Sequence, residues 1–208
     1  MNITLRPFQK EDAPFLEDII RKTWHYDDFC STKTSRKLAK IFLCSCLTNQ
    51  TFSRVALLNP KPVGIILGKN CAVHKCPLPL RIRQISSITS LLFSGEGRKT
   101  AKIFQDVDGI DKELLKECGT SYPAELALFA VDPECRGKGI GKTLFQSFLD
   151  YLKECQLSNF YLYTDTSCNY GFYEHQGMFR RREKTKSFHI KGQDVTMRFF
   201  IYDYILPL

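Results

Sequence analysis

Residues 125–152 read ELALFAVDPECRGKGIGKTLFQSFLDYL, and this stretch decides how the rest of the sequence is interpreted. Its first part, 125–131, is a continuous apolar run of the kind found in buried central strands, and Asp132-Pro133 ends it. From Gly141 onward the apolar residues return every three or four positions, as in a helix that packs on a sheet. The stretch therefore predicts a buried strand, a glycine-rich loop and a helix.

The loop between this strand and this helix has the composition of an anion site. Its three glycines let backbone N–H groups converge at the start of the helix, where the helix dipole also favours negative charge. Basic side chains add to that field. The residues expected to hold the anion are Arg136, Gly137, Lys138, Gly139, Ile140, Gly141 and Lys142.

Two other interpretations of the loop fit its residues less well. Gly141-Lys142-Thr143 matches the end of the nucleotide-binding pattern G-x-x-x-x-G-K-[ST], but its first glycine falls on Arg136, whose side chain would crowd the turn. An ordinary strand-to-helix turn usually needs one glycine, whereas this loop has three. An anion-binding loop that is not a P-loop is favoured over both.

The remaining elements are predicted from periodicity and turn residues. A strand at 3–6 is followed by two amphipathic helices, the first through Ile19 and the second through Leu38. A hairpin is expected from 53–58 and 63–68, further strands at 159–164 and 195–202, and a short helical piece near 169–176. The segment 71–122 reads as a mostly helical insertion.

Composition limits the class of protein. The 208 residues, 43% of them hydrophobic, suit one domain over 1–208, and no apolar stretch could span a bilayer or act as a signal core. Nine scattered cysteines read as reduced thiols, so a cytoplasmic protein that does not act at a membrane is expected. The net charge of +8 favours polyanionic partners, among which coenzyme A and nucleic acid both qualify.

Two motifs carry a resemblance to a known family. Arg136, Gly139 and Gly141 fit the coenzyme A loop pattern Q/R-x-x-G-x-G/A of the GNAT superfamily of N-acetyltransferases. NYGFYEHQGM at 169–178 is similar to the N…FYE..GF signature of the same superfamily, with Met178 in place of the usual Phe. The resemblance is specific over 124–180 and fails at 71–122, where the family ordinarily has only a short connection.

The resemblance implies an α/β (α+β) fold of three layers. A mixed, mostly antiparallel sheet would be flanked by helices, and its central strands 124–131 and 159–165 would run parallel and splay apart to admit coenzyme A. It also implies an acetyl-CoA cosubstrate without a metal, and transfer of the acetyl group to a primary amine by direct attack in a ternary complex. The cofactor-binding positions it adds are Phe129, Ala130, Val131, Asn169 and Phe172. An alternative for Asn169 is a helix N-cap.

Catalytic residues are expected in the same region. Glu125, at the start of the apolar strand, is the candidate base that draws a proton from the amine, and its alternative is an exposed strand-end position. Tyr173 matches the family tyrosine that protonates the leaving sulfur, and its alternative is core packing. Tyr26, Asp27 and Asp28 are candidate acceptor-binding residues, although acidic pairs in loops are more often only solvated.

Other functions and partners stay open at this level. A non-catalytic acyl-CoA-binding module and a nucleic-acid-binding protein using the basic run 180–186 are the rival classes, and no recognition helix supports the second. Cys71, His74 and Cys76 fit no usual zinc spacing. The segment 71–122 is expected to cover the acceptor side of the cleft, with a homodimer interface through residues such as Ile82 and Ile85 as the competitor. The acceptor is expected to be an amine on a small molecule or peptide.

Overall fold

The structure, a computed structural model, describes residues 3–207 and is built on one seven-stranded sheet. The strands are β1 (Ile3–Arg6), β2 (Phe52–Leu58), β3 (Lys61–Asn70), β4 (Ala124–Val131), β5 (Asn159–Asp165), β6 (Phe179–Ile190) and β7 (Gln193–Ile205). The α-helices are α1 (Ala13–Thr23), α2 (Tyr26–Phe29), α3 (Thr32–Thr48), α4 (Leu78–Leu92), α5 (Gly95–Cys118), α6 (Ile140–Glu154) and α7 (Gly171–His175). Short 3₁₀ turns occupy η1 (Lys10–Asp12) and η2 (Pro133–Cys135).

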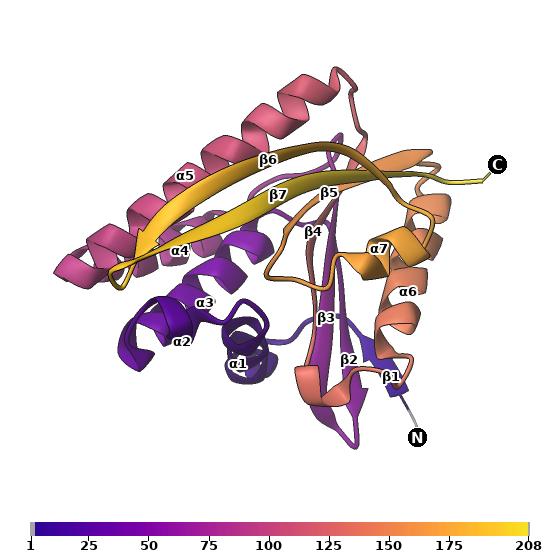
Figure 1. The fold of residues 1–208 in the computed structure, drawn as a ribbon. Helices are drawn as coiled ribbons and strands as arrows, with labels where there is room; N and C mark the ends of the chain where they lie inside the picture. The colour runs from indigo at the N-terminus through magenta and orange to yellow at the C-terminus, as the bar shows by residue number, and fades with distance from the viewer. Residues whose placement is uncertain (1–2, 208) are drawn as a thin grey trace.

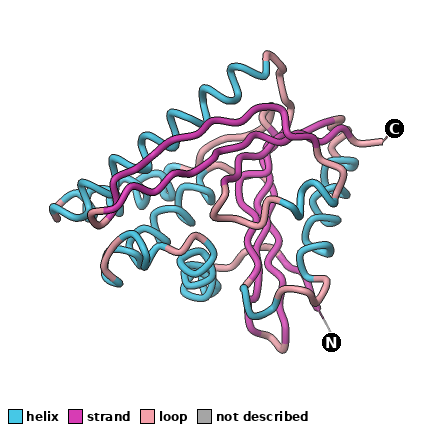
Figure 2. The backbone as a smooth tube through the Cα atoms, in the orientation of Figure 1, coloured by secondary structure: helices cyan, strands magenta, loops and turns pink. Residues whose placement is uncertain are grey.

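The sheet has the strand order β1-β2-β3-β4-β5-β7-β6 (Figures 1 and 2). Every neighbouring pair is antiparallel except β4 and β5, which run parallel and pair where Glu125 faces Tyr161. The mixed, mostly antiparallel sheet with a parallel central pair is therefore confirmed. Beyond that one pairing, the carboxyl-terminal parts of β4 and β5 line a cavity.

Helices cover both faces of the sheet and give three layers (Figure 1). On one face α6 packs over the central strands through Leu144, Phe145 and Phe148, all of which are buried. On the other face α1 and α3 bury Leu16, Ile20 and other apolar side chains against β2, β3 and β4. In α1, α3 and α6 these are the helix faces that the apolar periodicity of the sequence predicts.

The segment between β3 and β4 forms two helices, α4 and α5, that are part of the folded body. Leu91 of α4 is buried in the core beneath α1 and α3, and Leu114 of α5 is buried against β5, β6 and β7. In Figure 1, α5 runs alongside the long β6–β7 hairpin. Lys184 of that hairpin pairs with Glu113 and Glu117 of α5, at 2.6 and 2.7 Å. Removing this segment would therefore open two apolar clusters.

A β-bulge in β4 changes which side chains face each layer. Leu67 of β3 pairs with Leu128 and Gly68 pairs with Leu126, so Ala127 is an extra residue without a partner on β3. Before the bulge Leu126 packs with the α6 layer, whereas after it Leu128 joins the layer of α1 and α3. Bulges commonly re-aim side chains beside functional sites.

Gly68, opposite this bulge, is expected to tolerate no side chain. A Cβ there would lie 2.2 Å from Cε2 and 2.6 Å from Cδ2 of Phe148, a fully buried ring. Gly68→Ala should therefore cost about 1–3 kcal/mol of folding free energy. This corresponds to a fall in Tm of several degrees, since 1 kcal/mol shifts a protein of this size by roughly 2–4 °C.

The matched control is Gly109→Ala in α5, where an added Cβ meets nothing within 4 Å. Thermal unfolding should show this variant equal to or more stable than the parent, because alanine favours a helix over glycine by roughly 0.5–1 kcal/mol. Equal Tm values for the two variants would contradict the tight contact between Gly68 and Phe148.

Candidate active site

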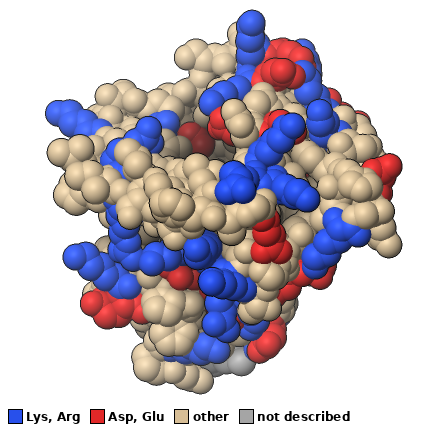
Figure 3. Space-filling model, turned by 90° about the vertical axis from the view of Figure 1, so that its left-hand side faces the viewer, with Lys and Arg blue, Asp and Glu red and all other residues tan. Residues whose placement is uncertain are grey.

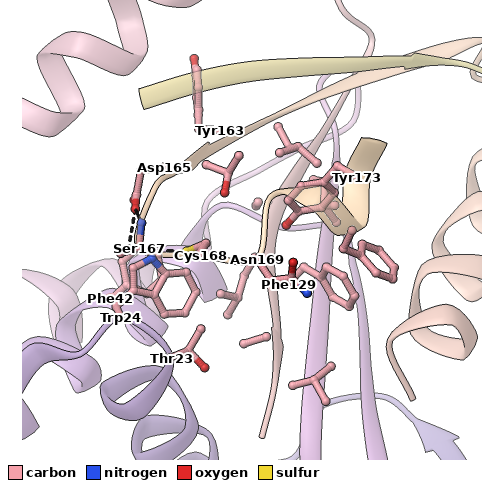
Figure 4. Close-up of a pocket in the computed structure, with 18 of the residues that line it drawn as sticks. Thr23, Trp24, Phe42, Phe129, Tyr163, Asp165, Ser167, Cys168, Asn169 and Tyr173 are labelled. Carbon is pink, nitrogen blue, oxygen red and sulfur yellow. Dashed lines mark hydrogen bonds between the residues drawn. The ribbon is translucent and has the colours of Figure 1, made fainter. Parts of the chain in front are cut away.

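A cavity of about 530 Å³ opens where β4 and β5 part (Figure 4). The chain segments that line it are β4, the loop 135–142, the end of β5 with the loop 167–169, α7, the region of α1 to α3, α5 and the β6–β7 hairpin. Most of its lining side chains are apolar or aromatic. The five charged residues in the lining are Asp111, Glu125, Arg136, Lys142 and Asp165.

The glycine-rich loop lies at one end of this cavity. Gly137 and Gly139 have φ values of +77° and +79°, a conformation that side-chain-bearing residues rarely adopt, and Gly139 is the N-cap of α6. Within residues 3–207, none of the backbone N–H groups of 137–142 has a hydrogen-bond acceptor. Arg136, Lys138 and Lys142 are exposed around them. The loop thus presents unpaired donors, the positive end of a helix and basic side chains together.

Aromatic side chains form the wall next to the loop. The Phe129 and Phe172 ring centroids are 5.2 Å apart, and those of Phe129 and Tyr173 are 6.3 Å apart. A Cβ on Gly141 would touch Phe129 and Phe172, each at 3.5 Å, so this glycine keeps the passage between loop and rings open. Ala130 and Val131, also predicted for the cofactor, line the cavity from β4.

Tyr173 and Asn169 face the cavity from the α7 region (Figure 4). Burial raises the pKa of the Tyr173 phenol well above its ordinary value, so the hydroxyl stays protonated. The Tyr173 hydroxyl has no hydrogen-bond partner within the described chain. Asn169 makes no side-chain capping bond to α7, whose N-cap is Tyr170. Both side chains are therefore available to a ligand.

Glu125 lies at the closed end of the split between the strands. Its side chain is 13% exposed and has Lys69 Nζ at 3.6 Å. Tyr161 donates to Glu125 Oε2 at 3.2 Å, and Asn49 Nδ2 lies 3.3 Å from the same oxygen. The carboxylate is thus oriented by three neighbours while still lining the cavity.

Two further acids line the cavity, and no sequence signal singled them out. Asp111 of α5 is half-buried, and burial together with the negative charges of Asp165, Asp108 and Glu125 raises its pKa to about 7. Burial also raises the pKa of Asp165 at the end of β5. Ser167 donates its N–H and its hydroxyl to Asp165 Oδ1, at 2.7 and 2.5 Å (Figure 4).

The residues predicted to bind the acceptor are placed differently from one another. Tyr26 is buried, lines the cavity and packs edge-on against Phe104 with centroids 5.7 Å apart. Asp27 points elsewhere, since its carboxylate is paired with Arg21 and accepts from Ser35 Oγ. Asp28 is exposed and lies beside a separate shallow hollow. The acids that the structure brings to the cavity are Asp111, Glu125 and Asp165.

Three of the five cations of the basic run 180–186 form ion pairs within the protein, and His74 of the Cys/His segment contacts the backbone. Arg180 pairs with Glu174 and Glu183, Arg181 pairs with buried Asp203 at 2.7 Å, and Lys184 pairs with α5. His74 Nε2 lies 2.9 Å from the carbonyl oxygen of Thr48. Across residues 3–207, no three His, Cys, Asp or Glu side chains gather as a metal site. In the same part of the chain no helix has the length and apolar character to cross a bilayer.

The sequence and the fold are both similar to those of known proteins. The family model described as "Acetyltransferase (GNAT) family" matches residues 16–178. A search of curated proteins finds no match to the sequence. Solved structures with the same fold include the ribosomal-protein-S18-alanine N-acetyltransferase from Escherichia coli, which is 13% identical with a TM-score of 0.56 over 100% of this chain and 96% of that chain.

Two archaeal structures are also similar. Ard1 from Thermoplasma volcanium is 15% identical, with a TM-score of 0.56 over 100% of both chains. The PaiA N-acetyltransferase from Thermoplasma acidophilum, solved in complex with coenzyme A, is 17% identical, with a TM-score of 0.50 over 99% of this chain and 100% of that chain. At these identities the likeness concerns the fold.

Proposed function

Because the chain belongs to the GNAT acetyltransferase family, we propose that it transfers an acetyl group from acetyl-CoA to a primary amine by direct attack in a ternary complex. The observation that carries the proposal is the cavity between β4 and β5, which connects the unpaired N–H groups of the loop 137–142 with a group of recessed carboxylates. One end suits the pyrophosphate of coenzyme A, and the other suits an amine.

The donor is held by the glycine loop and the neighbouring strand. The N–H groups of 137–142 bind the pyrophosphate oxygens, with Arg136 and Lys142 compensating the charge. The pantetheine arm then runs between β4 and α7, past Phe129 and Asn169. Its amides pair with the free edge of β4 as an added strand would, because β5 has already diverged from that edge.

The chemical step needs a base, an oxyanion donor and an acid. Glu125 accepts a proton from the ammonium group, directly or through water, and the neutral amine attacks the thioester carbonyl carbon. The backbone N–H of Ala127 in the bulge is the donor that we assign to the developing oxyanion. The C–N bond forms first and gives a tetrahedral oxyanion; the C–S bond then breaks, and Tyr173 protonates the departing thiolate and recovers its proton from the amine nitrogen.

A direct assay tests this function. Acetyl-CoA at about 100 times its Kd should stabilise the protein by about 2.7 kcal/mol, measured by thermal unfolding, because it binds only the folded state. With a panel of primary amines present, free thiol should be released in proportion to acetylated amine found by mass spectrometry. Stabilisation without thiol release for any amine would identify an acyl-CoA-binding module instead. No stabilisation at all would reject the coenzyme site.

A further inference from the structure

The charges that line the cavity are separated by sign. Arg136 and Lys142, its two cationic lining residues, both belong to the glycine loop, where the phosphates would bind. The three acids come from other elements: Glu125 from β4, Asp165 from β5 and Asp111 from α5. On the face drawn in Figure 3, acidic atoms lie recessed in a hollow, and Lys, Arg and further acidic side chains lie on the surface around it. The cavity therefore offers a negative end that the anionic donor would avoid.

Two of these acids, Asp111 and Asp165, form no ion pair within the described residues. Glu125 has Lys69 at 3.6 Å, but no Lys or Arg pairs with Asp111 or Asp165 within the described residues. Asp165 is satisfied at one oxygen by Ser167, and Asp111 accepts no hydrogen bond from the described chain. A carboxylate in an apolar cavity without a counter-ion is costly to ionise, and a ligand cation that pairs with it would favour its charged form.

A polar side chain of α1 also lines the cavity without a hydrogen-bond partner in the described chain. Thr23 is 8% exposed and lines the cavity, and its Oγ1 has no hydrogen-bond partner within residues 3–207. A buried hydroxyl is rarely left unpaired unless a bound molecule or water completes it. In Figure 4, Thr23 lies on the same side of the cavity as Asp165 and Ser167, opposite Phe129 and Tyr173. This independent observation also indicates that the cavity holds a ligand.

The walls around these polar groups are aromatic. Trp24 and Phe42 pack with ring centroids 5.0 Å apart, and Tyr26 and Phe104 pack edge-on. Val107, one turn before Asp111 on α5, adds an aliphatic surface. Such walls favour a flat apolar body, and aromatic faces also attract an ammonium group. A polyamine would need acids spread along its length, whereas Asp165 and Glu125 lie near enough to Asp111 to raise its pKa.

We propose that the acceptor is a primary amine with a single ammonium group on a ring-bearing apolar body, an arylalkylamine, and that Asp111 with Asp165 determines this specificity. The inference rests on the proposed acetyl transfer. The ring lies among the aromatic side chains of α1 to α3 and α5, while the ammonium group binds the two carboxylates before the amine reaches the thioester. Asp111 acts here as a specificity-determining residue and takes no part in the chemical step.

The test compares 2-phenylethylamine, spermidine and a short peptide as acceptors with the full chain and acetyl-CoA. Thiol release should give a kcat/KM for 2-phenylethylamine at least about tenfold above the other two. In Asp111→Asn the KM for 2-phenylethylamine should rise at least about tenfold, because a charged hydrogen bond is lost, whereas the Kd of acetyl-CoA stays within about twofold. Neutral 2-phenylethanol should inhibit the parent and Asp111→Asn equally.

The control variant is Glu113→Gln on the same helix. Glu113 is 65% exposed and pairs with Lys184 at 2.6 Å, outside the cavity lining, so its KM should not change. Thermal unfolding verifies that both variants fold. An unchanged KM in Asp111→Asn, or a preference for spermidine or peptide over 2-phenylethylamine, overturns the inference while leaving acetyl transfer intact. If no amine releases thiol, the proposed function itself fails, and 2-phenylethanol binding to the parent still reports on the aromatic pocket.

Discussion

Replacing Gly141 by Val is expected to weaken acetyl-CoA binding at least about 100-fold. A Cβ at this position lies 3.5 Å from both Phe129 and Phe172, so the two methyl groups of Val would fill the passage between these rings and the loop. The backbone of Gly141 is in the first turn of α6 and needs no positive φ, so the fold should persist. Calorimetric titration with acetyl-CoA measures the Kd, and thermal unfolding checks the fold.

The matched control is Gly95→Val, which makes the same change in the first turn of α5. An added Cβ there meets only the end of the Arg98 side chain, at 3.9 Å, so acetyl-CoA affinity should equal that of the parent. Gly139→Val is expected to abolish binding as well. It carries an added strain of about 1–3 kcal/mol, because residue 139 has φ +79°. A folded Gly141→Val protein with parental affinity would remove the coenzyme A assignment of this loop.

Tyr173→Phe should lower kcat by about 10²–10³ while leaving the Kd of acetyl-CoA within about twofold. The substitution removes one hydroxyl at the cavity that makes no hydrogen bond within the described chain, so the fold loses little. A phenol whose pKa is raised by burial keeps the proton that the leaving thiolate needs. Steady-state thiol release at saturating substrates, with binding measured separately, distinguishes the two effects.

Tyr170→Phe provides the control for this change. Tyr170 lies in the same turn, packs its ring 5.1 Å from that of Phe200 and is not part of the cavity lining within residues 3–207. Its kcat should stay close to that of the parent. Parental turnover in Tyr173→Phe would assign Tyr173 a packing role only.

The sequence was most informative where function depends on consecutive residues. The apolar run 125–131, the glycines of the loop and the periodic helix after it lie together in the chain, so their pattern predicted the strand, loop and helix that the structure contains. The hairpin of β2 and β3 was predicted for the same reason, because Asn59-Pro60 is local turn chemistry. The fold class followed from these elements and from the family resemblance.

Features that depend on tertiary contacts were not predictable in this way. Asp111 is one of several acids on α5, and only the packing of α5 against the hairpin shows that it faces the cavity whereas Asp108 faces solvent. Asp27 carried a plausible acidic signal, but the structure pairs it with Arg21. The bulge at Ala127 leaves no mark in a uniformly apolar strand, because a one-residue change of register alters no local preference.

Tertiary contacts also decide which experiments on the segment 71–122 are informative. Replacing it with a short flexible connection would expose the partners of buried Leu91 and Leu114, so loss of activity would report only a damaged core. Its apolar residues Ile82 and Ile85 are 60% and 55% exposed on α4. Point variants on the cavity side of α5, such as Asp111→Asn, separate specificity from folding.

The bulge at Ala127 also has a consequence for comparing this chain with distant relatives. On one side of it Leu126 faces the α6 layer, and on the other side Phe129 faces the same layer, three positions later instead of two or four. Deleting one residue here would turn every later side chain of β4, up to the glycine loop, to the opposite face of the sheet. An alignment of homologous sequences should therefore never place a gap between Glu125 and Phe129, and this spacing is a firmer anchor for alignment than residue identity.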